Sequence, residues 1–330
     1  MLVIEMKRLF KSAFLISIVL VFQFLSDPSY AIMAGGPPDS PAARVDANTT
    51  TSTWSGVGSV KVNGVGYSGV AIGRYHVLTA GHVVKGAAPA NVSYVLNYGA
   101  NSSHNIPAAA IFPHPNFISF NSPNLNNDIA IVELAEPIPE GVPIYELNTV
   151  ALATGTTLTL VGYGASGNGS IGVTVGAVET VKRVGSNQAD AFILDDNGSG
   201  KNEIFYFDFD GGGVTNQLGG TSLGNSIEST LASNDSGSPS FIQRNGRWLV
   251  AGINTFIFTF PNGPMTAGTF GTGGGGQLVD AYIDWIRTIV PVATSTDIPT
   301  LPEWAAITLA TILLALVVSR QGVSKKALIM

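Results

Sequence analysis

The chain has 330 residues, 45% of them hydrophobic, and a formal net charge of −6 from 16 Lys and Arg against 22 Asp and Glu. This hydrophobic content excludes a disordered chain, and the acidic balance argues against a phosphate-backbone partner, so no nucleic-acid partner is expected. Cysteine is absent, which excludes disulfides, thiolate metal sites and cysteine nucleophiles.

The N-terminal segment is predicted to be a signal peptide over residues 1–31. Three cations precede an apolar run at residues 13–25, and Ser29-Tyr30-Ala31 follows as a small-x-small cleavage signal. Cleavage is expected after Ala31, with Ala34 as the other candidate. An uncleaved membrane anchor is the alternative, but the apolar run is shorter than the roughly 20 residues that span a bilayer.

The middle of the chain is predicted to be all-β. After a loose lead-in at 32–53, a domain at 54–292 contains short apolar runs separated by turn residues, which indicate antiparallel strands. The expected strands are 57–65, 69–72, 75–79, 92–97, 108–112, 129–134, 157–162, 173–181, 203–209, 240–243 and 248–258. Residues 278–290 have the periodicity of one amphipathic helix. Many Gly, Asn and Ser residues at 195–235 indicate long loops. The pattern predicts a barrel or sandwich.

The C-terminal segment is predicted to be a sorting and membrane segment at 301–330, joined by a linker at 293–300. Residues 304–318 carry no charge and precede Arg320, Lys325 and Lys326, a flank that would stay inside the cell. A buried C-terminal helix is the alternative.

Residues 298–304, read as Ile-Pro-Thr-Leu-Pro-Glu-Trp, resemble the IPTL-type sorting signals of Gram-negative bacteria. That resemblance implies export to the cell envelope or extracellular surface, transient membrane anchoring and processing by an exosortase-like peptidase.

Three polar residues are candidates for acyl-transfer chemistry. His82 follows the apolar run 77–80, Asp128 precedes the run 129–134, and Ser236 lies in an Asp-Ser-Gly turn before residues 240–242. Serine catalysis needs a hydroxyl nucleophile, an imidazole base, a carboxylate that orients the base and backbone N–H groups facing the oxyanion. The spacing of these residue types is compatible with that chemistry.

These motifs resemble the chymotrypsin-like, trypsin-fold serine proteases, particularly the disulfide-free bacterial members. The resemblance covers about residues 54–290 and includes Val-Gly-Tyr-Gly at 161–164 and Ala-Gly-Ile-Asn-Thr-Phe at 251–256. It implies two six-stranded antiparallel β-barrels with a C-terminal helix, an exported serine endopeptidase, and polypeptide substrates.

The same resemblance implies a role for each residue. Ser236 would be the nucleophile, His82 the general base and then acid, and Asp128 the group that orients His82. The N–H groups of Asn234 and Ser236 would form the oxyanion hole, and Asp235 would shape that loop. Asn234 stands where relatives usually have Gly, but Asn tolerates positive φ better than other non-glycine residues.

Removal of the signal peptide could activate the enzyme. Cleavage after Ala31 would expose Ile32, whose new amino group could pair with Asp235, as in the relatives. Any other mature N-terminus would remove this hypothesis.

The substrate pocket is expected to involve Thr230 at its base, with Thr255, Phe256 and Ile257 on its wall. Without an acidic residue at the base, no charge favours Lys or Arg substrates. Ile257, where relatives often have Gly, would narrow the pocket. We therefore expect a preference for small or medium apolar side chains.

Other titratable residues give weaker indications. His76, His104 and His114 are interpreted as surface or structural residues. No metal site is expected and no cofactor is needed, although calcium remains an alternative at an acidic region that contains Asp195, Asp196, Asp208, Asp210 and Glu228. Two other functions stay open: a catalytically weak or inactive homologue that acts as a surface binding module, and a Gly-rich adhesin or coat component with a coincidental triad.

Overall fold

The computed structural model describes residues 32–99, 101–119, 125–211, 213, 217–261, 263–264 and 266–291. The predicted signal peptide at 1–31, the linker at 293–300 and the sorting segment at 301–330 lie outside these residues. The chain divides into a compact unit that ends at residue 289 and a second unit from residue 290 onward. Among the helices that could be assessed, none is long and apolar enough to cross a membrane.

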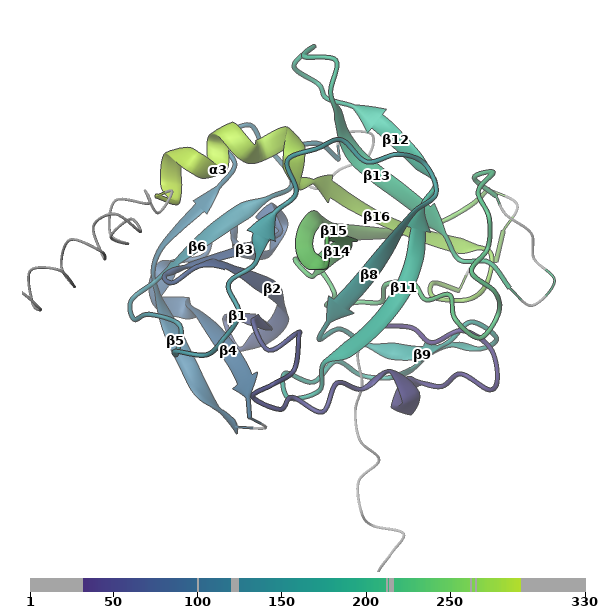
Figure 1. The fold of residues 1–330 in the computed structure, drawn as a ribbon, viewed down its shortest axis with the longest axis horizontal. Coiled ribbons are helices and arrows are strands. Elements are labelled where there is room, and N and C mark those ends of the chain that lie inside the picture. Colours follow the sequence, from purple (N-terminus) through teal and green to yellow (C-terminus); the bar gives the residue numbers. More distant parts are fainter. Residues whose placement is uncertain are drawn as a thin grey trace, which may run out of the picture. The chain divides into compact units, whose positions relative to one another are not determined.

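The first half of the domain is a closed six-stranded antiparallel barrel, drawn in purple to blue in Figure 1. Its hydrogen-bonded order is β1 (Val57–Val62), β2 (Val65–Gly73), β3 (His76–Thr79), β6 (Ala130–Leu134), β5 (Asn101–Pro113) and β4 (Val92–Tyr98). Asn63 and Gly64 connect β1 to β2, and both have positive φ, as tight two-residue hairpins require. This barrel confirms the first part of the fold prediction.

The second half is an eight-stranded sheet rather than a second closed six-stranded path among the described residues. Its order is β11 (Arg183–Ala189), β8 (Thr156–Gly162), β14 (Pro239–Arg244), β15 (Arg247–Thr259), β16 (Thr272–Leu278), β13 (Asn202–Asp208) and β12 (Ala191–Leu194). A short β7 (Glu146–Leu147) pairs in parallel with β15. Two strands, β9 (Ser166–Asn168) and β10 (Gly172–Val175), form a separate ribbon.

Strand β16 carries four consecutive glycines at its centre, and at three of them an aromatic ring occupies the space that a side chain would need. A Cβ atom on Gly273 would lie 2.5 Å from the Phe258 ring, and one on Gly275 would lie 2.6 Å from the Phe256 ring. On the opposite face, a Cβ on Gly274 would lie 2.8 Å from the Phe207 ring. The glycines therefore let the rings of the neighbouring strands close over both faces of β16.

The helices are short. They are η1 (Pro41–Arg44), α2 (Gly81–Val84), η2 (Pro89–Asn91), η3 (Val279–Tyr282) and α3 (Ile283–Ile289). The helix predicted at 278–290 is present in shortened form, because Leu278 ends β16 and the first turn is a 3-10 helix. Ile283 and Ile286 are the buried residues of α3.

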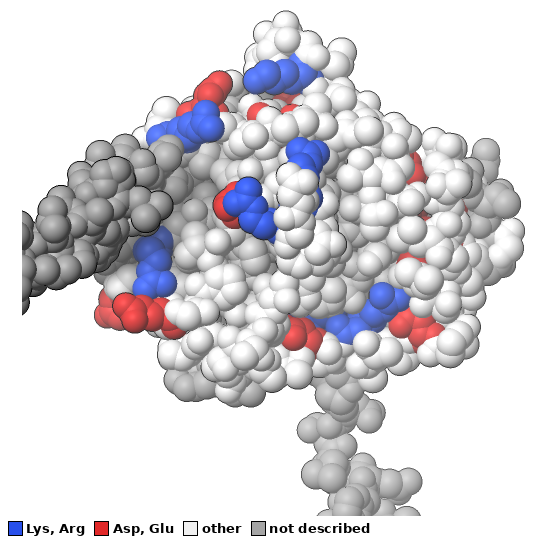
Figure 2. Space-filling model, viewed as in Figure 1, with Lys and Arg blue, Asp and Glu red and all other residues white. Residues whose placement is uncertain are grey.

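Charged side chains are sparse on the face shown in Figure 2, and blue and red atoms lie side by side in several places. Among the ion pairs of the described residues are Arg44 with Asp39 at 2.5 Å and Lys61 with Glu179 at 2.9 Å. Paired charges of this kind largely cancel at a distance.

Candidate active site

His82 lies in the short helix α2, directly after strand β3. Val83 and Val84 are buried and anchor this turn in the barrel. Gly81 is required by space, because a Cβ there would lie 2.9 Å from the Phe117 ring and 3.1 Å from Asp128 Oδ1. The His82 side chain remains 24% exposed, so it is accessible from solvent.

Asp128 lies just before β6 and is completely buried. Its Oδ1 accepts a hydrogen bond from the His82 backbone N–H at 2.7 Å, and its Oδ2 lies 2.7 Å from His82 Nδ1. Both carboxylate oxygens thus contact one residue, and the imidazole orientation is fixed relative to its own backbone. The two residues come together across 46 positions of sequence.

Ser236 lies in a tight loop between the two β-structures. Its carbonyl accepts a 3.0 Å hydrogen bond from the Ser68 N–H of β2, while the Gly237 N–H donates to the Asn254 carbonyl of β15 at 2.8 Å. Gly237 has a φ of 83°, and a Cβ there would lie 2.1 Å from Thr79 Oγ1. Only glycine fits this position, so the loop shape is dictated locally.

Two backbone N–H groups in this loop are left without a protein acceptor among the described residues. Within the described part of the chain, neither the Asn234 N–H nor the Ser236 N–H makes a hydrogen bond to a protein acceptor. Asn234 has a φ of 73°, in the left-handed region that Asn tolerates. Asn therefore provides at this position the backbone conformation for which glycine is otherwise suited.

Asp235 is buried beneath the loop. Its oxygens accept hydrogen bonds from the N–H groups of Ala232 and Gly164, both at 2.9 Å, and from the backbone N–H of Ile32. Burial raises the pKa of Asp235 to about 7, although these donors and the charge of Arg183 oppose the rise. Ile32 itself is fully buried, so the start of the described chain is bound inside the loop region.

A cleft of about 230 Å³ joins His82 and Ser236 to three of the predicted pocket residues, Thr255, Phe256 and Ile257. Thr230 does not line the cleft: it is 1% exposed, and its carbonyl accepts from the Met33 N–H. Leu231 lines the cleft instead. The sequence did not single out Leu231, although it directly follows the predicted base residue.

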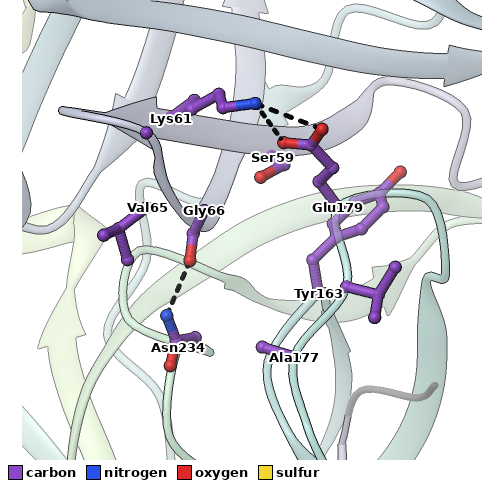
Figure 3. Close-up of a pocket in the computed structure, with 10 residues that line it drawn as sticks. Ser59, Lys61, Val65, Gly66, Tyr163, Ala177, Glu179 and Asn234 are labelled. Carbon is purple, nitrogen blue, oxygen red and sulfur yellow. Dashed lines mark hydrogen bonds and ion pairs between the residues drawn. The ribbon is translucent and has the colours of Figure 1, made fainter.

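A larger cavity, of about 490 Å³, is lined by Asn234 of the Ser236 loop and by the β1–β2 hairpin, and it shares no lining residue with the first cleft. In Figure 3 the Asn234 side chain points to Gly66, and its Nδ2 donates to the Gly66 carbonyl at 2.7 Å. The Lys61–Glu179 ion pair forms another wall, and the buried hydroxyl of Ser59 has no hydrogen-bond partner among the described residues. The cavity therefore presents polar groups of both charges.

The five acidic residues considered for calcium do not gather at one place. Asp195 and Asp196 follow β12 and precede β13, and Asp196 accepts from Asn127 Nδ2 at 3.3 Å. Glu228 accepts from the Asp210 N–H at 2.5 Å, and Asp208 accepts from the Leu218 N–H. Among the residues that could be searched, no group of three or more His, Asp or Glu side chains is arranged to hold a metal ion.

A family model described as Trypsin matches residues 44–286, which include His82, Asp128, Ser236 and both halves of the domain. No curated protein matches the chain. The match covers most of the sequence, so the chain belongs to the trypsin family of serine peptidases.

Proposed function

We propose that the protein is an exported serine endopeptidase that uses Ser236, His82 and Asp128. The observation that carries the proposal is the 2.7 Å contact between His82 Nδ1 and Asp128 Oδ2, in a cleft that His82 and Ser236 line together. An acceptor at Nδ1 leaves Nε2 unprotonated in the neutral imidazole, which is the form that removes a hydroxyl proton.

In the proposed reaction, Ser236 Oγ attacks the substrate carbonyl carbon while its proton moves to His82 Nε2. The carbonyl oxygen becomes an oxyanion, His82 gives the proton to the leaving amine, and the C–N bond breaks. Water then repeats the sequence on the acyl-enzyme and releases the acid. The N–H groups of Asn234 and Ser236 would bind the oxyanion, and each donor of this kind contributes roughly 3 to 4 kcal/mol to transition-state binding.

Hydrolysis of a peptide library by the purified domain tests the proposal. We expect cleavage by the native protein and none by Ser236→Ala, which removes only the nucleophilic oxygen. A folded, monodisperse native protein without hydrolytic activity would instead support the alternative, an inactive homologue that acts as a binding module.

The lining of the cleft supports a preference for small or medium apolar side chains just before the scissile bond. Leu231 and Ile257 both occupy space in the cleft. Ile257→Gly is expected to extend the preference to large apolar residues and raise kcat/KM for Phe substrates about tenfold, in line with roughly 1 to 3 kcal/mol for steric changes in an apolar pocket. Cleavage profiling checks this; an unchanged profile would place the substrate side chain elsewhere.

The cavity beside Asn234 is proposed to hold a side chain on the leaving-group side of the scissile bond, because it adjoins the Ser236 loop at Asn234 and shares no lining residue with the first cleft. Its Lys61–Glu179 pair is 33% and 37% exposed and neutral overall, which favours uncharged polar side chains.

Lys61→Gln should therefore shift leaving-side preference toward Lys and Arg, and Glu179→Gln toward Asp and Glu, each by about two- to fivefold. The preference for the side chain before the scissile bond should stay unchanged in both variants, and it serves as the internal control in the same profiles. Identical leaving-side profiles for both variants would contradict the assignment.

Export and transient anchoring complete the proposal. They are supported by the sequence features of residues 1–31 and 298–326, a signal-peptide pattern and an IPTL-type motif followed by an apolar run and cations. An acidic mature domain would then meet polypeptide substrates in the envelope or outside the cell.

A further inference from the structure

Glu203 is a buried carboxylate that the sequence analysis did not select. It lies near the start of β13 and is 2% exposed. Its Oε1 accepts from the Asn127 N–H at 3.0 Å and also from the Tyr282 hydroxyl, and its Oε2 accepts from Asn126 Nδ2 at 2.5 Å. Among the described residues it forms no ion pair with Lys or Arg.

These contacts hold the two residues that lead into Asp128. Asn127 has a φ of 64°, and its N–H also lies 2.9 Å from the Tyr282 hydroxyl. Tyr282 is positioned in turn by Gln277 Oε1 at 2.8 Å. The turn before β6 of the barrel is therefore fixed by the second half of the domain, through β13, β16 and η3.

The position of this turn determines where the Asp128 carboxylate lies. Asp128 is fully buried and directs both oxygens to His82, so a shift of its backbone would weaken both contacts. Glu203 is a second buried carboxylate, and it contacts the two residues that precede Asp128. Burying a carboxylate is unfavourable unless hydrogen bonds offset its lost hydration. A neutral side chain would fill the same space at lower cost, which makes a purely space-filling role a poor explanation for Glu203.

We propose that Glu203 is a positioning residue for the Asp128–His82 pair: it fixes the Asn126–Asn127 turn and so sets the imidazole for proton transfer. It does not touch the substrate. The proposal rests on the proposed serine-peptidase function, and it assigns to Glu203 a role in geometry rather than in charge.

Three variants test the proposal: Glu203→Ala, Glu203→Gln and Tyr282→Phe. Active sites are titrated first, so that kcat refers to correctly folded molecules. Glu203→Ala is expected to lower kcat about 10- to 100-fold with KM within twofold, as small misplacements of catalytic groups do. Glu203→Gln should restore kcat to within about threefold of the native value, since its carbonyl oxygen can still accept from the Asn127 N–H. Tyr282→Phe, which keeps the carboxylate, should lie between them.

A proton NMR signal provides a second readout that does not depend on turnover. The His82 Nδ1–H proton, hydrogen-bonded to Asp128, should resonate far downfield in the native protein and in Glu203→Gln, and should shift upfield or broaden in Glu203→Ala. Tyr145→Phe is the matched control, because it removes a buried hydroxyl that donates to the Thr53 carbonyl at 2.7 Å. It should lower stability without changing kcat per titrated site or this signal.

The outcomes separate the two proposals. Absence of hydrolysis by the native protein would count against the peptidase function, while the NMR comparison would still report on Glu203. An active native protein with unchanged kcat per site and an unchanged Nδ1–H signal in Glu203→Ala would overturn the positioning role. If Glu203→Ala does not fold, Tyr282→Phe provides the test. A kcat and a His82 Nδ1–H signal equal to the native values in Tyr282→Phe would also overturn the positioning role.

Discussion

Replacing Asp128 with Asn is expected to lower kcat about ten-thousand-fold while leaving KM nearly unchanged. Asp128 Oδ2 accepts from His82 Nδ1 and Oδ1 from the His82 backbone N–H, both at 2.7 Å. The side-chain amide of Asn has one acceptor oxygen and one NH₂ group, which can only donate. Because the backbone N–H needs the acceptor, the NH₂ group would face Nδ1 and force the proton onto Nε2. That tautomer cannot accept the Ser236 proton.

The measurement is steady-state kinetics on the native protein and Asp128→Asn, both shown to be folded by circular dichroism. Glu146→Gln is a suitable control, because it also removes one carboxylate, from a side chain that is 59% exposed and paired with Arg247. It should leave kcat unchanged. A loss of less than tenfold in Asp128→Asn would show that Asp128 does not set the His82 tautomer.

The form of the protein that begins at Ile32 is expected to be about 100-fold more active than a form that retains the upstream residues. The Ile32 N–H already faces Asp235 in the described structure. Cleavage after Ala31 would replace this amide by a positively charged amine at neutral pH. An ion pair between this amine and Asp235 would then fix the loop that carries the Asn234 and Ser236 N–H groups. Loss of a single oxyanion donor of this kind lowers kcat by about 10²- to 10³-fold.

The free energy of unfolding should also depend on pH differently in the two forms. In the uncleaved form, burial raises the pKa of Asp235 to about 7, above the roughly 4 of an unfolded aspartate. The folded state therefore binds the Asp235 proton more tightly than the unfolded state does. This contribution to the free energy of unfolding is fully present below pH 4 and is lost as the pH rises to about 7. The loss would reach roughly 4 kcal/mol. In the cleaved form, the amine lowers the pKa of Asp235, and this loss should disappear.

Urea unfolding between pH 4 and 8 tests this difference, with each N-terminus determined by mass spectrometry. Asp235→Asn in the uncleaved form is the control and should remove the contribution of Asp235, leaving the dependence on pH that Asp190 and Glu228 give to both forms, because burial raises the pKa of these two carboxyls as well. Equal activities and equal pH profiles for the two forms would contradict the role of Ile32, as would a mature N-terminus at another residue.

Much of the barrel could be predicted from local sequence, but β16 could not. The runs of Val, Ile and Leu at 57–62, 77–79 and 129–134 carry the alternation and turn signals of strands. Four glycines in succession have low strand propensity. They form a strand here because β16 pairs with β13 and β15 and the Phe256, Phe258 and Phe207 rings cover three of the glycines, and these partners come from other parts of the sequence. The separation of β9 and β10 from the main sheet likewise depends on tertiary pairing.

The site shows the same division between local and long-range information. His82, Asp128 and Ser236 each lie in a short motif next to a strand, so all three could be selected from the sequence as candidates, and the fold brings His82 and Asp128 into contact and places His82 and Ser236 in one cleft. The cleft lining depends on which side chain of a strand or loop faces inward, and Leu231 rather than Thr230 does so. Glu203 contacts Asn127 across 76 residues of sequence, and nothing in the run around it marks that contact.

We propose that Ser236 is a reactive nucleophile because it lines the same cleft as His82. The most direct test is labelling of the native protein with a fluorophosphonate, followed by digestion and mass spectrometry of the modified peptide. We expect one phosphonylated residue, Ser236, and no labelling of Ser236→Ala or of heat-unfolded protein. Labelling at another residue, or a labelled band that persists in Ser236→Ala, would contradict it.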